Sequence, residues 1–222
     1  MHSHTHSHET LAQTRGRLIR WAFFYDTFTT ILTLGHAGRL RTMTVDLAQL
    51  KPGEKILDVG CGTGGVTLPA KQRVGSNGHA AGIDPAPEMI VVARKKAARA
   101  GLEIDFRIGV IESLPYPDAS FDVVTSSLMM HHLPYEVQVK GLAEIRRVLK
   151  PGGQIFIVDM LRLSKSLHDR LFATLTFHGG RVERFGIQDL QKTIEEAGFE
   201  KIQLLDESFL TIGFLRAVKP SR

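Results

Sequence analysis

A glycine-rich turn that joins a short apolar segment to a helix-compatible one constrains the fold more than any other feature. The turn, Leu57-Asp58-Val59-Gly60-Cys61-Gly62-Thr63-Gly64-Gly65, follows Lys55-Ile56 and leads into a stretch that begins near Val66. A strand that passes through glycines into a helix presents backbone N–H groups to a ligand. Asp84 ends the next apolar strand, where its carboxylate can accept both hydroxyls of a ribose. We therefore expect a nucleoside-binding βαβ unit at the start of the core.

The spacing of the glycines leaves the identity of the nucleoside open. Gly60-x-Gly62-x-x-Gly65 also satisfies the dinucleotide pattern, which is a weak signal, and a plain tight turn is the simplest structural alternative. Asp58 argues against NAD, because an acid beside the loop favours a cationic ligand over a pyrophosphate. S-adenosylmethionine carries both an ammonium and a sulfonium. An NAD-dependent oxidoreductase remains an alternative, although no catalytic set of that class is recognisable.

Composition indicates a globular protein with one full core. The chain has 222 residues, of which 43% are hydrophobic and 23% charged. It has no apolar run of about eighteen residues that would span a membrane and no apolar signal-peptide core at its start. The single cysteine, Cys61, excludes an internal disulfide and fits a reducing compartment, so we expect a cytoplasmic protein. Cys61 is interpreted as a small packing residue of the loop rather than a catalytic thiol.

The charge pattern does not demand an anionic partner. A formal net charge of +5 admits nucleic acid, acidic lipid or an acidic substrate. Basic runs are short, however, and no aromatic–basic signature of RNA binding is present, so no nucleic-acid partner is expected. The alternating histidines of residues 1–10 predict a disordered tail, with metal binding as the less favoured alternative. No metal site is expected in the folded part, and the oligomeric state stays open.

A bulky apolar face marks the stretch 11–34, which we expect to be helical. Residues of this face recur at spacings of three and four: Trp21, Phe24, Tyr25, Phe28, Ile31 and Leu32. Upstream lie Arg15, Arg17 and Arg20. The face can pack on the core, cover the substrate or lie on the inner face of a membrane as a peripheral contact, with the arginines as anchors. With a second helix expected at 39–50, the stretch forms a helical cap, residues 11–50.

Strands and helices then alternate, which predicts a parallel sheet covered by helices on both faces. The expected strands are 56–59, 79–84, 104–108, 121–126 and 154–159, and the expected helices are 66–74, 87–100 and 135–149. Residues 150–153 are interpreted as a turn before the fifth strand. Further helices are expected at 161–177 and 187–197. Strands at 199–205 and 209–218 are joined by a short polar link and are expected to pair antiparallel.

Four motifs in register resemble those of the class I S-adenosylmethionine-dependent methyltransferases. They are Ile56-Leu57-Asp58-Val59-Gly60-Cys61-Gly62-Thr63-Gly64, Gly82-Ile83-Asp84, the stretch Leu114-Pro115-Tyr116-Pro117-Asp118 with Phe121-Asp122-Val123-Val124, and Leu149-Lys150-Pro151-Gly152-Gly153. One such motif is a weak signal, whereas four in order are a strong one. The resemblance implies an α/β, Rossmann-like, doubly wound seven-stranded sheet in residues 51–222, mostly parallel with an antiparallel last strand.

The most similar subgroup is that of the ubiquinone/menaquinone-biosynthesis C-methyltransferases. Tyr25-Asp26 followed by Arg39-Leu40-Arg41 resembles an arrangement of that subgroup. Phospholipid N-methyltransferases of one bacterial type are related to it, so the resemblance leaves the methyl acceptor open. It implies that S-adenosylmethionine is the cofactor and S-adenosylhomocysteine the product.

The resemblance also implies roles for matching residues. Asp58 and the backbone of Gly60, Gly62 and Gly64 would hold the methionine end, with Cys61 and Thr63 in the same loop. Asp84, followed by Pro85, would bind the ribose, and Met89 would lie against the adenine. Ser126 or Ser127 would face the reacting centre, and Tyr25 would close over the cofactor. Apart from Met89 and Tyr25, which belong to expected helices, these residues lie at or just beyond the ends of expected strands.

Two pairs of residues leave alternatives open for recognition and chemistry. Val110 and Ile111 stand where the family has a polar residue against the adenine edge, so adenine recognition would rely on backbone groups or on Glu112. His131 and His132 follow the fourth strand, beside the expected methyl group. One of them can take a proton from the acceptor, since a histidine titrates near neutrality, or the pair can merely shape the pocket.

Two classes of function follow. The first is methyl transfer to a small or lipophilic acceptor, such as a quinone precursor, because aromatic and leucine-rich segments would flank the site. A phospholipid or other small-molecule N-methyltransferase is its variant. The second is a non-catalytic nucleoside-sensing or membrane-surface binding protein on the same fold, which the apolar residue at Val110 favours. RNA methylation ranks low, since no Asn-Pro-Pro-Tyr-like motif is present.

Overall fold

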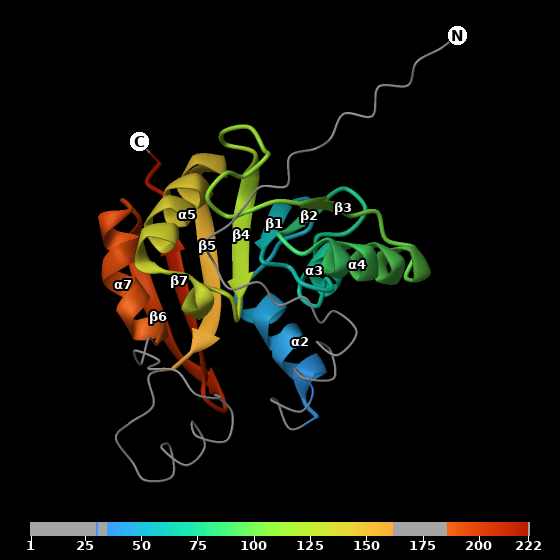
Figure 1. The fold of residues 1–222 in the computed structure, drawn as a ribbon, viewed down its shortest axis with the longest axis horizontal. Coiled ribbons are helices and arrows are strands. Elements are labelled where there is room, and N and C mark those ends of the chain that lie inside the picture. Colours follow the sequence, from blue (N-terminus) through green and yellow to red (C-terminus); the bar gives the residue numbers. More distant parts are fainter. Residues whose placement is uncertain (1–29, 31–34, 162–185, 222) are drawn as a thin grey trace.

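A seven-stranded sheet forms the centre of the molecule, with helices on both of its faces (Figure 1). The computed structural model describes residues 30, 35–161 and 186–221. The strands are β1 (Lys55–Val59), β2 (His79–Asp84), β3 (Asp105–Ile108), β4 (Phe121–Ser127), β5 (Leu149–Met160), β6 (Glu200–Phe209) and β7 (Ile212–Val218). The helices are α2 (Ala37–Leu47), α3 (Thr67–Val74), α4 (Pro87–Arg99), the 3-10 turn η1 (Met130–His132), α5 (Tyr135–Val148) and α7 (Ile187–Glu196).

The strand order, β3-β2-β1-β4-β5-β7-β6, confirms the expected doubly wound fold. Strands β1 to β5 pair in parallel, and β7 runs antiparallel between β5 and β6. The chain winds outward from β1 in one direction and then returns to place β4 on the other side of β1. Ligands of such sheets bind beyond the carboxyl ends of the strands at this switch point.

The two faces of the sheet build two separate cores. Along β1, Ile56 packs with α2 and α3, whereas its neighbour Leu57 packs with α5 and α7. This alternation follows from the two-residue period of a strand, and both residues are apolar because helices cover both faces. Helix α4 completes the α2–α3 side, where Ile90 and Ala93 pack against Phe106 of β3. Figure 1 shows α5 and α7 together on one side of the sheet.

The segment 150–153 differs from the expected turn, because it belongs to β5. Gly152 has a φ of +76°, and its N–H donates to the carbonyl of Lys219 at 3.0 Å. The Lys219 N–H donates back to Gly153 at 2.8 Å, so the chain beyond β7 continues the pairing. A Cβ atom at Gly153 would lie 2.9 Å from the carbonyl oxygen of Asp122. The glycines therefore allow a strand with an irregularity, not a reversal.

Other boundaries move by a few residues. The helix expected at 39–50 ends at Leu47, and Phe209, expected to start a strand, ends β6. The expected tail 1–10, nearly all of the helix 11–34 and the helix 161–177 lie outside the described residues, apart from Thr30 and Leu161. Within the described ranges, no helix has both the length and the apolar character needed to cross a bilayer.

Candidate functional site

The glycine loop lies at the carboxyl end of β1 and depends on backbone conformations that other residues rarely adopt. Gly60, Gly62 and Gly64 have φ values of +74°, +50° and +79°. A Cβ atom at Gly60 would lie 2.6 Å from Cγ of Met129. A side chain at Gly60 would therefore be strained by both conformation and space, and the loop keeps a bare backbone surface.

Most N–H groups of this loop bond within the protein, which differs from the expected row of ligand-facing donors. The N–H groups of Gly60 and Cys61 donate to the carbonyl of Ile83 at 2.8 and 3.0 Å. That of Gly62 donates to Oδ2 of Asp84 at 2.9 Å. These bonds tie the loop to the end of β2. The loop therefore serves a ligand mainly by letting it approach the bare backbone closely, and less by offering N–H donors.

Asp84 is held where a ribose acceptor is expected. Its Oδ1 accepts the N–H of Ala86 and its Oδ2 the N–H of Gly62, both at 2.9 Å. Burial raises its pKa, and the two backbone bonds oppose that rise. Each carboxylate oxygen can accept a second bond, so both can still receive a hydroxyl. Pro85 follows in the turn to α4, and Met89 lies buried in the first part of that helix.

Asp58 is a buried carboxylate next to the loop. It is 2% exposed, and its two oxygens accept hydroxyl bonds from Thr67 at 2.7 Å and Thr125 at 2.9 Å. Burial raises its pKa to about 6, although both hydroxyls favour the charged form. At neutral pH the group therefore carries a negative charge with little solvent around it, which suits a cation such as an α-ammonium.

A cavity of about 50 Å³ lies between α2 and the glycine loop. Its lining residues are Ala37, Leu40, Arg41, Thr44, Asp58, Gly60, Cys61, Thr63, Gly65, Val66, Ser127 and Leu128. Ser127, one of the two serines expected to face the reacting centre, lines this cavity. Ser126 is fully buried and is not among the lining residues, as expected for its neighbour on the opposite face of β4. Thr63 is held from outside by Lys96, whose Nζ lies 2.8 Å from Oγ1 of Thr63.

His131 is paired with an acid that sequence reasoning did not single out. Its Nδ1 lies 2.5 Å from Oδ1 of Asp159, and its backbone N–H donates to Oδ2 of the same carboxylate at 3.2 Å. Asp159 is 1% exposed and lies near the carboxyl end of β5. An acid at a strand end, beside a strand that leads to histidines, is the signal that points to it.

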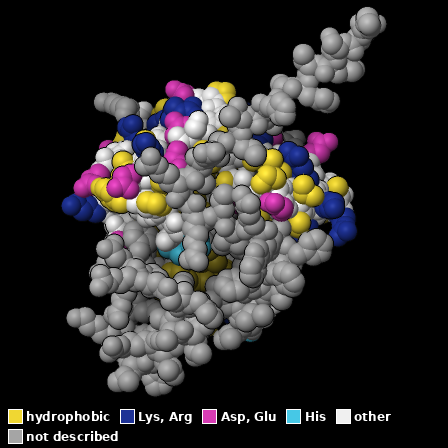
Figure 2. Space-filling view, in the orientation of Figure 1, with side chains coloured by type: hydrophobic (Ala, Val, Ile, Leu, Met, Phe, Trp, Pro, Cys, Tyr) yellow, Lys and Arg dark blue, Asp and Glu magenta, His cyan; other side chains and the backbone are white. Residues whose placement is uncertain are grey.

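The histidine turn is held by its neighbours. The rings of His131 and His132 lie 3.8 Å apart between centroids, at 46°. Gln138 of α5 donates from Nε2 to the carbonyls of Met130 at 3.2 Å and Leu133 at 3.0 Å, on either side of the pair. Figure 2 shows histidine and hydrophobic side chains together in a hollow of this face. The turn is therefore anchored at both ends.

The residues expected near the adenine are largely packing residues. Ile111 is 6% exposed and belongs to the core with α5, where its Cδ1 would lie 2.5 Å from a Cβ atom at Gly141. Val110 is buried and pairs with Ser113 in a short bridge. Glu112, which lies between Ile111 and Ser113 in the sequence, is half-buried. Tyr25 lies outside the described residues.

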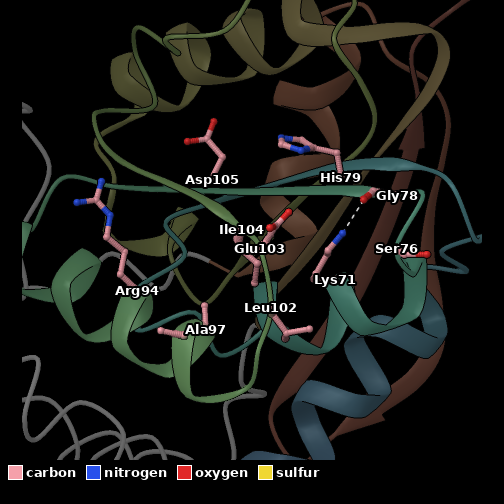
Figure 3. Close-up of a pocket in the computed structure, with 11 residues that line it drawn as sticks. Lys71, Ser76, Gly78, His79, Arg94, Ala97, Leu102, Glu103, Ile104 and Asp105 are labelled. Atoms are coloured by element: carbon pink, nitrogen blue, oxygen red, sulfur yellow. Dashed lines mark hydrogen bonds between the residues drawn. The ribbon is translucent and has the colours of Figure 1, made fainter.

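A larger hollow, about 570 Å³, lies at the opposite edge of the sheet, where β2 and β3 begin (Figure 3). Three of its charged groups, Lys71, Arg94 and Asp105, are engaged within the protein. Lys71 donates to the carbonyls of Gly75 and Gly78, and Arg94 to that of Phe106. Asp105 forms an ion pair with Arg107 at 2.8 Å. We assign no site there, because these groups do not converge on a ligand.

Known proteins share both the sequence motifs and the fold. A family model described as a methyltransferase domain matches residues 56–153. The demethylmenaquinone methyltransferase of Thermus thermophilus is 38% identical over 136 residues, 61% of this chain and 60% of that protein. The arsenite methyltransferase of Halobacterium salinarum is 35% identical over 164 residues, 72% of this chain and 41% of that protein. The chain thus spans less than two thirds of either relative.

Solved structures extend the likeness to the fold. An S-adenosylmethionine-dependent methyltransferase from Aquifex aeolicus superposes with a TM-score of 0.66 at 23% identity, covering 80% of this chain and 88% of that one. The [4+2]-cyclase SpnF superposes equally well, with a TM-score of 0.66 at 22% identity, covering 83% and 81%. The fold alone therefore does not name a reaction. The motif match, the strand order and the cofactor-type loop together show that the chain belongs to the class I S-adenosylmethionine-dependent methyltransferases.

Proposed function

We propose that this protein transfers a methyl group from S-adenosylmethionine to a lipophilic small molecule of the quinone-precursor type. The observation that carries the proposal is the bond of 2.5 Å between His131 and the buried Asp159 at the carboxyl edge of the sheet. The relatives named demethylmenaquinone methyltransferase support this acceptor class. The apolar face of residues 11–34 in the sequence is a second support.

In this proposal the strand ends share the binding of the cofactor. Asp84 binds the ribose, while Asp58 and the bare loop of Gly60, Gly62 and Gly64 hold the methionine end. Met89 and the segment 110–112 lie on the adenine side. The cavity beside α2 supports the cap that we assign to residues 11–50, because that helix forms one of its walls.

His131 is suited to remove a proton from the acceptor. When bound, the cofactor supplies a methyl group on a sulfonium, so positioning provides much of the rate. With the proton of His131 on Nδ1 and directed at Asp159, its Nε2 has a free lone pair that can accept a proton from a carbon or hydroxyl acid. The buried carboxylate then stabilises the imidazolium, as in hydrolase triads.

Arsenite is the less favoured acceptor. Arsenic(III), like other soft metal ions, prefers thiolate ligands. The chain carries one cysteine, Cys61, which is buried in the glycine loop. Burial raises the pKa of its thiol, which keeps it protonated at neutral pH. This chain therefore lacks the set of thiolates that would bind arsenite.

Replacing the paired residues tests the proposal. We expect His131→Ala to lower kcat by about 100-fold or more with a demethylmenaquinol-like acceptor. Asp159→Asn should lower kcat and shift its pH profile, because the partner of the imidazolium loses its charge. Affinity for S-adenosylhomocysteine should stay within about twofold in both variants, since neither side chain is assigned to its binding.

The control is His79→Ala, at the opposite edge of the sheet, which should match wild type. A wild-type kcat in His131→Ala would refute the role of the pair. Turnover of a phospholipid amine in place of the quinol would move the acceptor to the N-methyltransferase alternative.

A further inference from the structure

Three apolar side chains belong to the strand ends that carry His131 and Asp159. Met129 and Leu133 flank the turn η1, and Leu161 directly follows β5. All three pack against the core that includes α5 and α7, yet they stay half-buried. Figure 2 shows histidine and hydrophobic side chains together in a hollow. Apolar walls around a few polar groups are typical of a site for a small apolar ligand.

The end of β5 places Leu161 on the same face of the sheet as Asp159. The two residues are two positions apart in an extended chain, so their side chains point to one face, about 7 Å apart. The N–H of Leu161 donates to the carbonyl of Thr211 at 2.7 Å, which continues the pairing beyond β5. Leu161 therefore lies one step further towards the ligand edge than the acid that holds His131.

Gly213 of β7 leaves the space that Leu161 occupies. It is the partner of Asp159 in the antiparallel pair, so both positions face the same side. A Cβ atom at Gly213 would lie 2.7 Å from Cδ2 of Leu161 and 3.3 Å from Cγ2 of Ile187. Gly213 does not have a positive φ, so its backbone would accept alanine without conformational strain. The missing side chain therefore matters for the position of Leu161.

The order of the strands separates a cofactor side from an acceptor side. Met129 lies against Gly60 of the glycine loop, where a Cβ atom would be 2.6 Å from its Cγ. Strand β4, which leads to His131, stands between β1 and β5. With the cofactor above β1 and the reacting carbon at the imidazole, the rest of the acceptor extends over β5 and β7. Leu161 and Gly213 lie there.

We propose that Leu161, seated on Gly213, is a specificity-determining residue that contacts the apolar chain of the acceptor beside its reacting ring. This rests on the proposed function and deepens it, because it assigns a wall of the site to the lipophilic part of the acceptor. With Leu161 held back on Gly213, the pocket admits a ring with a chain. With Leu161 displaced towards the pocket, only a bare ring fits.

The test compares two acceptors that differ in the chain alone. One is naphthohydroquinone, and the other is the same ring with a prenyl group next to the methylated carbon. Gly213→Ala should raise KM for the prenylated acceptor at least about tenfold and leave KM for the bare ring within about threefold. Affinity for S-adenosylhomocysteine should stay within about twofold. Gly38→Ala is the control, since a Cβ atom there meets nothing within 4 Å and φ is not positive.

A second variant separates displacement of Leu161 from damage to β7. The double variant Gly213→Ala/Leu161→Ala should recover the prenylated acceptor and match Leu161→Ala, because no side chain is left to displace. Leu161→Phe fills the same space without a change in β7 and should discriminate against the prenylated acceptor as Gly213→Ala does.

Equal changes in KM for both acceptors in Gly213→Ala and Leu161→Phe, or no change, would overturn the inference. So would a double variant that stays as poor as Gly213→Ala. If the wild-type protein methylates neither hydroquinone, the proposed function itself is refuted, and this assignment with it.

Discussion

Two carboxylates at neighbouring strand ends, the half-buried Asp84 and the buried Asp58, have different hydrogen-bond partners. Asp84 accepts two backbone N–H bonds, which fix its position, whereas Asp58 accepts two threonine hydroxyls. Burial raises the pKa of both groups, and the charge of Asp84 adds to the rise at Asp58. Neither carboxylate stabilises the ligand-free fold by being charged. Their ionised state is better explained by a ligand than by folding.

Asp58→Asn should stabilise the ligand-free protein and weaken cofactor binding. The pKa of Asp58 is about 6 in the folded protein, above the ordinary value of 3.8. The ionised group therefore opposes folding fully above pH 6, and this penalty fades as the pH falls from 6 towards 4. The melting temperature of the variant should exceed that of wild type at pH 7.5, and the difference should shrink towards pH 4.5.

The exposed acid Asp206 supplies the control, since Asp206→Asn should show no such pH-dependent difference. A variant of Asp58 that is less stable at pH 7.5 would mean that its two threonine bonds outweigh the cost of burial. The same variant should bind S-adenosylhomocysteine more weakly, because the acceptor for the ammonium has lost its charge.

The turn η1 shows how separate elements assemble one site. The turn follows β4 and contains His131, whose ring contacts Asp159 of β5. Gln138 of α5 donates hydrogen bonds to the backbone of the turn. None of these elements alone defines where the imidazole lies. A small displacement of this turn would move the imidazole away from an acceptor while the sheet stays intact.

Gln138→Leu should therefore reduce both stability and turnover. The carbonyls of Met130 and Leu133 lose a side-chain donor, a cost of about 1–3 kcal/mol. We expect kcat to fall by about tenfold with unchanged affinity for S-adenosylhomocysteine, as measured by steady-state kinetics and titration. Gln138→Glu should lower turnover at least as much, because a carboxylate oxygen would then face the same two carbonyl oxygens. Val139→Ala on the exposed side of the same helix is the control. Wild-type turnover in both Gln138 variants would show that η1 keeps its position without this bond.

The groups that we assign to ligand binding lie at one edge of the sheet, whereas charged groups at the opposite edge form bonds within the protein. Asp58, Asp84 and Asp159 all lie near carboxyl ends of parallel strands. At the other edge, Lys71 donates to the carbonyl of Gly78 (Figure 3), and Arg94 donates to that of Phe106. A ligand that joins several strand ends should therefore stabilise the entire cooperative unit.

S-adenosylhomocysteine should raise the melting temperature, and NAD should not. At 100 times the dissociation constant, a ligand that binds the folded state alone contributes about 2.7 kcal/mol. For a chain of this size the shift should be about 5–10 °C. Differential scanning fluorimetry with increasing ligand measures it. A shift with NAD of equal size would favour the dinucleotide alternative over Asp58 as a cation acceptor.

Features built from neighbouring residues could be predicted from the sequence. The order of strands and helices, the glycine loop and the acid at the end of β2 depend on hydrophobic periodicity and glycine conformation. The prediction of a turn at 150–153 was wrong. This segment pairs with residues near Lys219, which lie far along the chain. The sequence likewise does not reveal that Ile111 packs in the core with α5, because this packing depends on the space left by Gly141.

The sequence was sufficient for the family, the doubly wound sheet and the positions of Asp58, Asp84 and His131 at strand ends, because local pattern encodes these. Folding was needed to bring Asp159 to His131, Gln138 to the carbonyls of η1 and Leu161 against Gly213. These pairs join different elements. Their geometry depends on how strands pair and helices pack, and no short stretch of sequence contains that information.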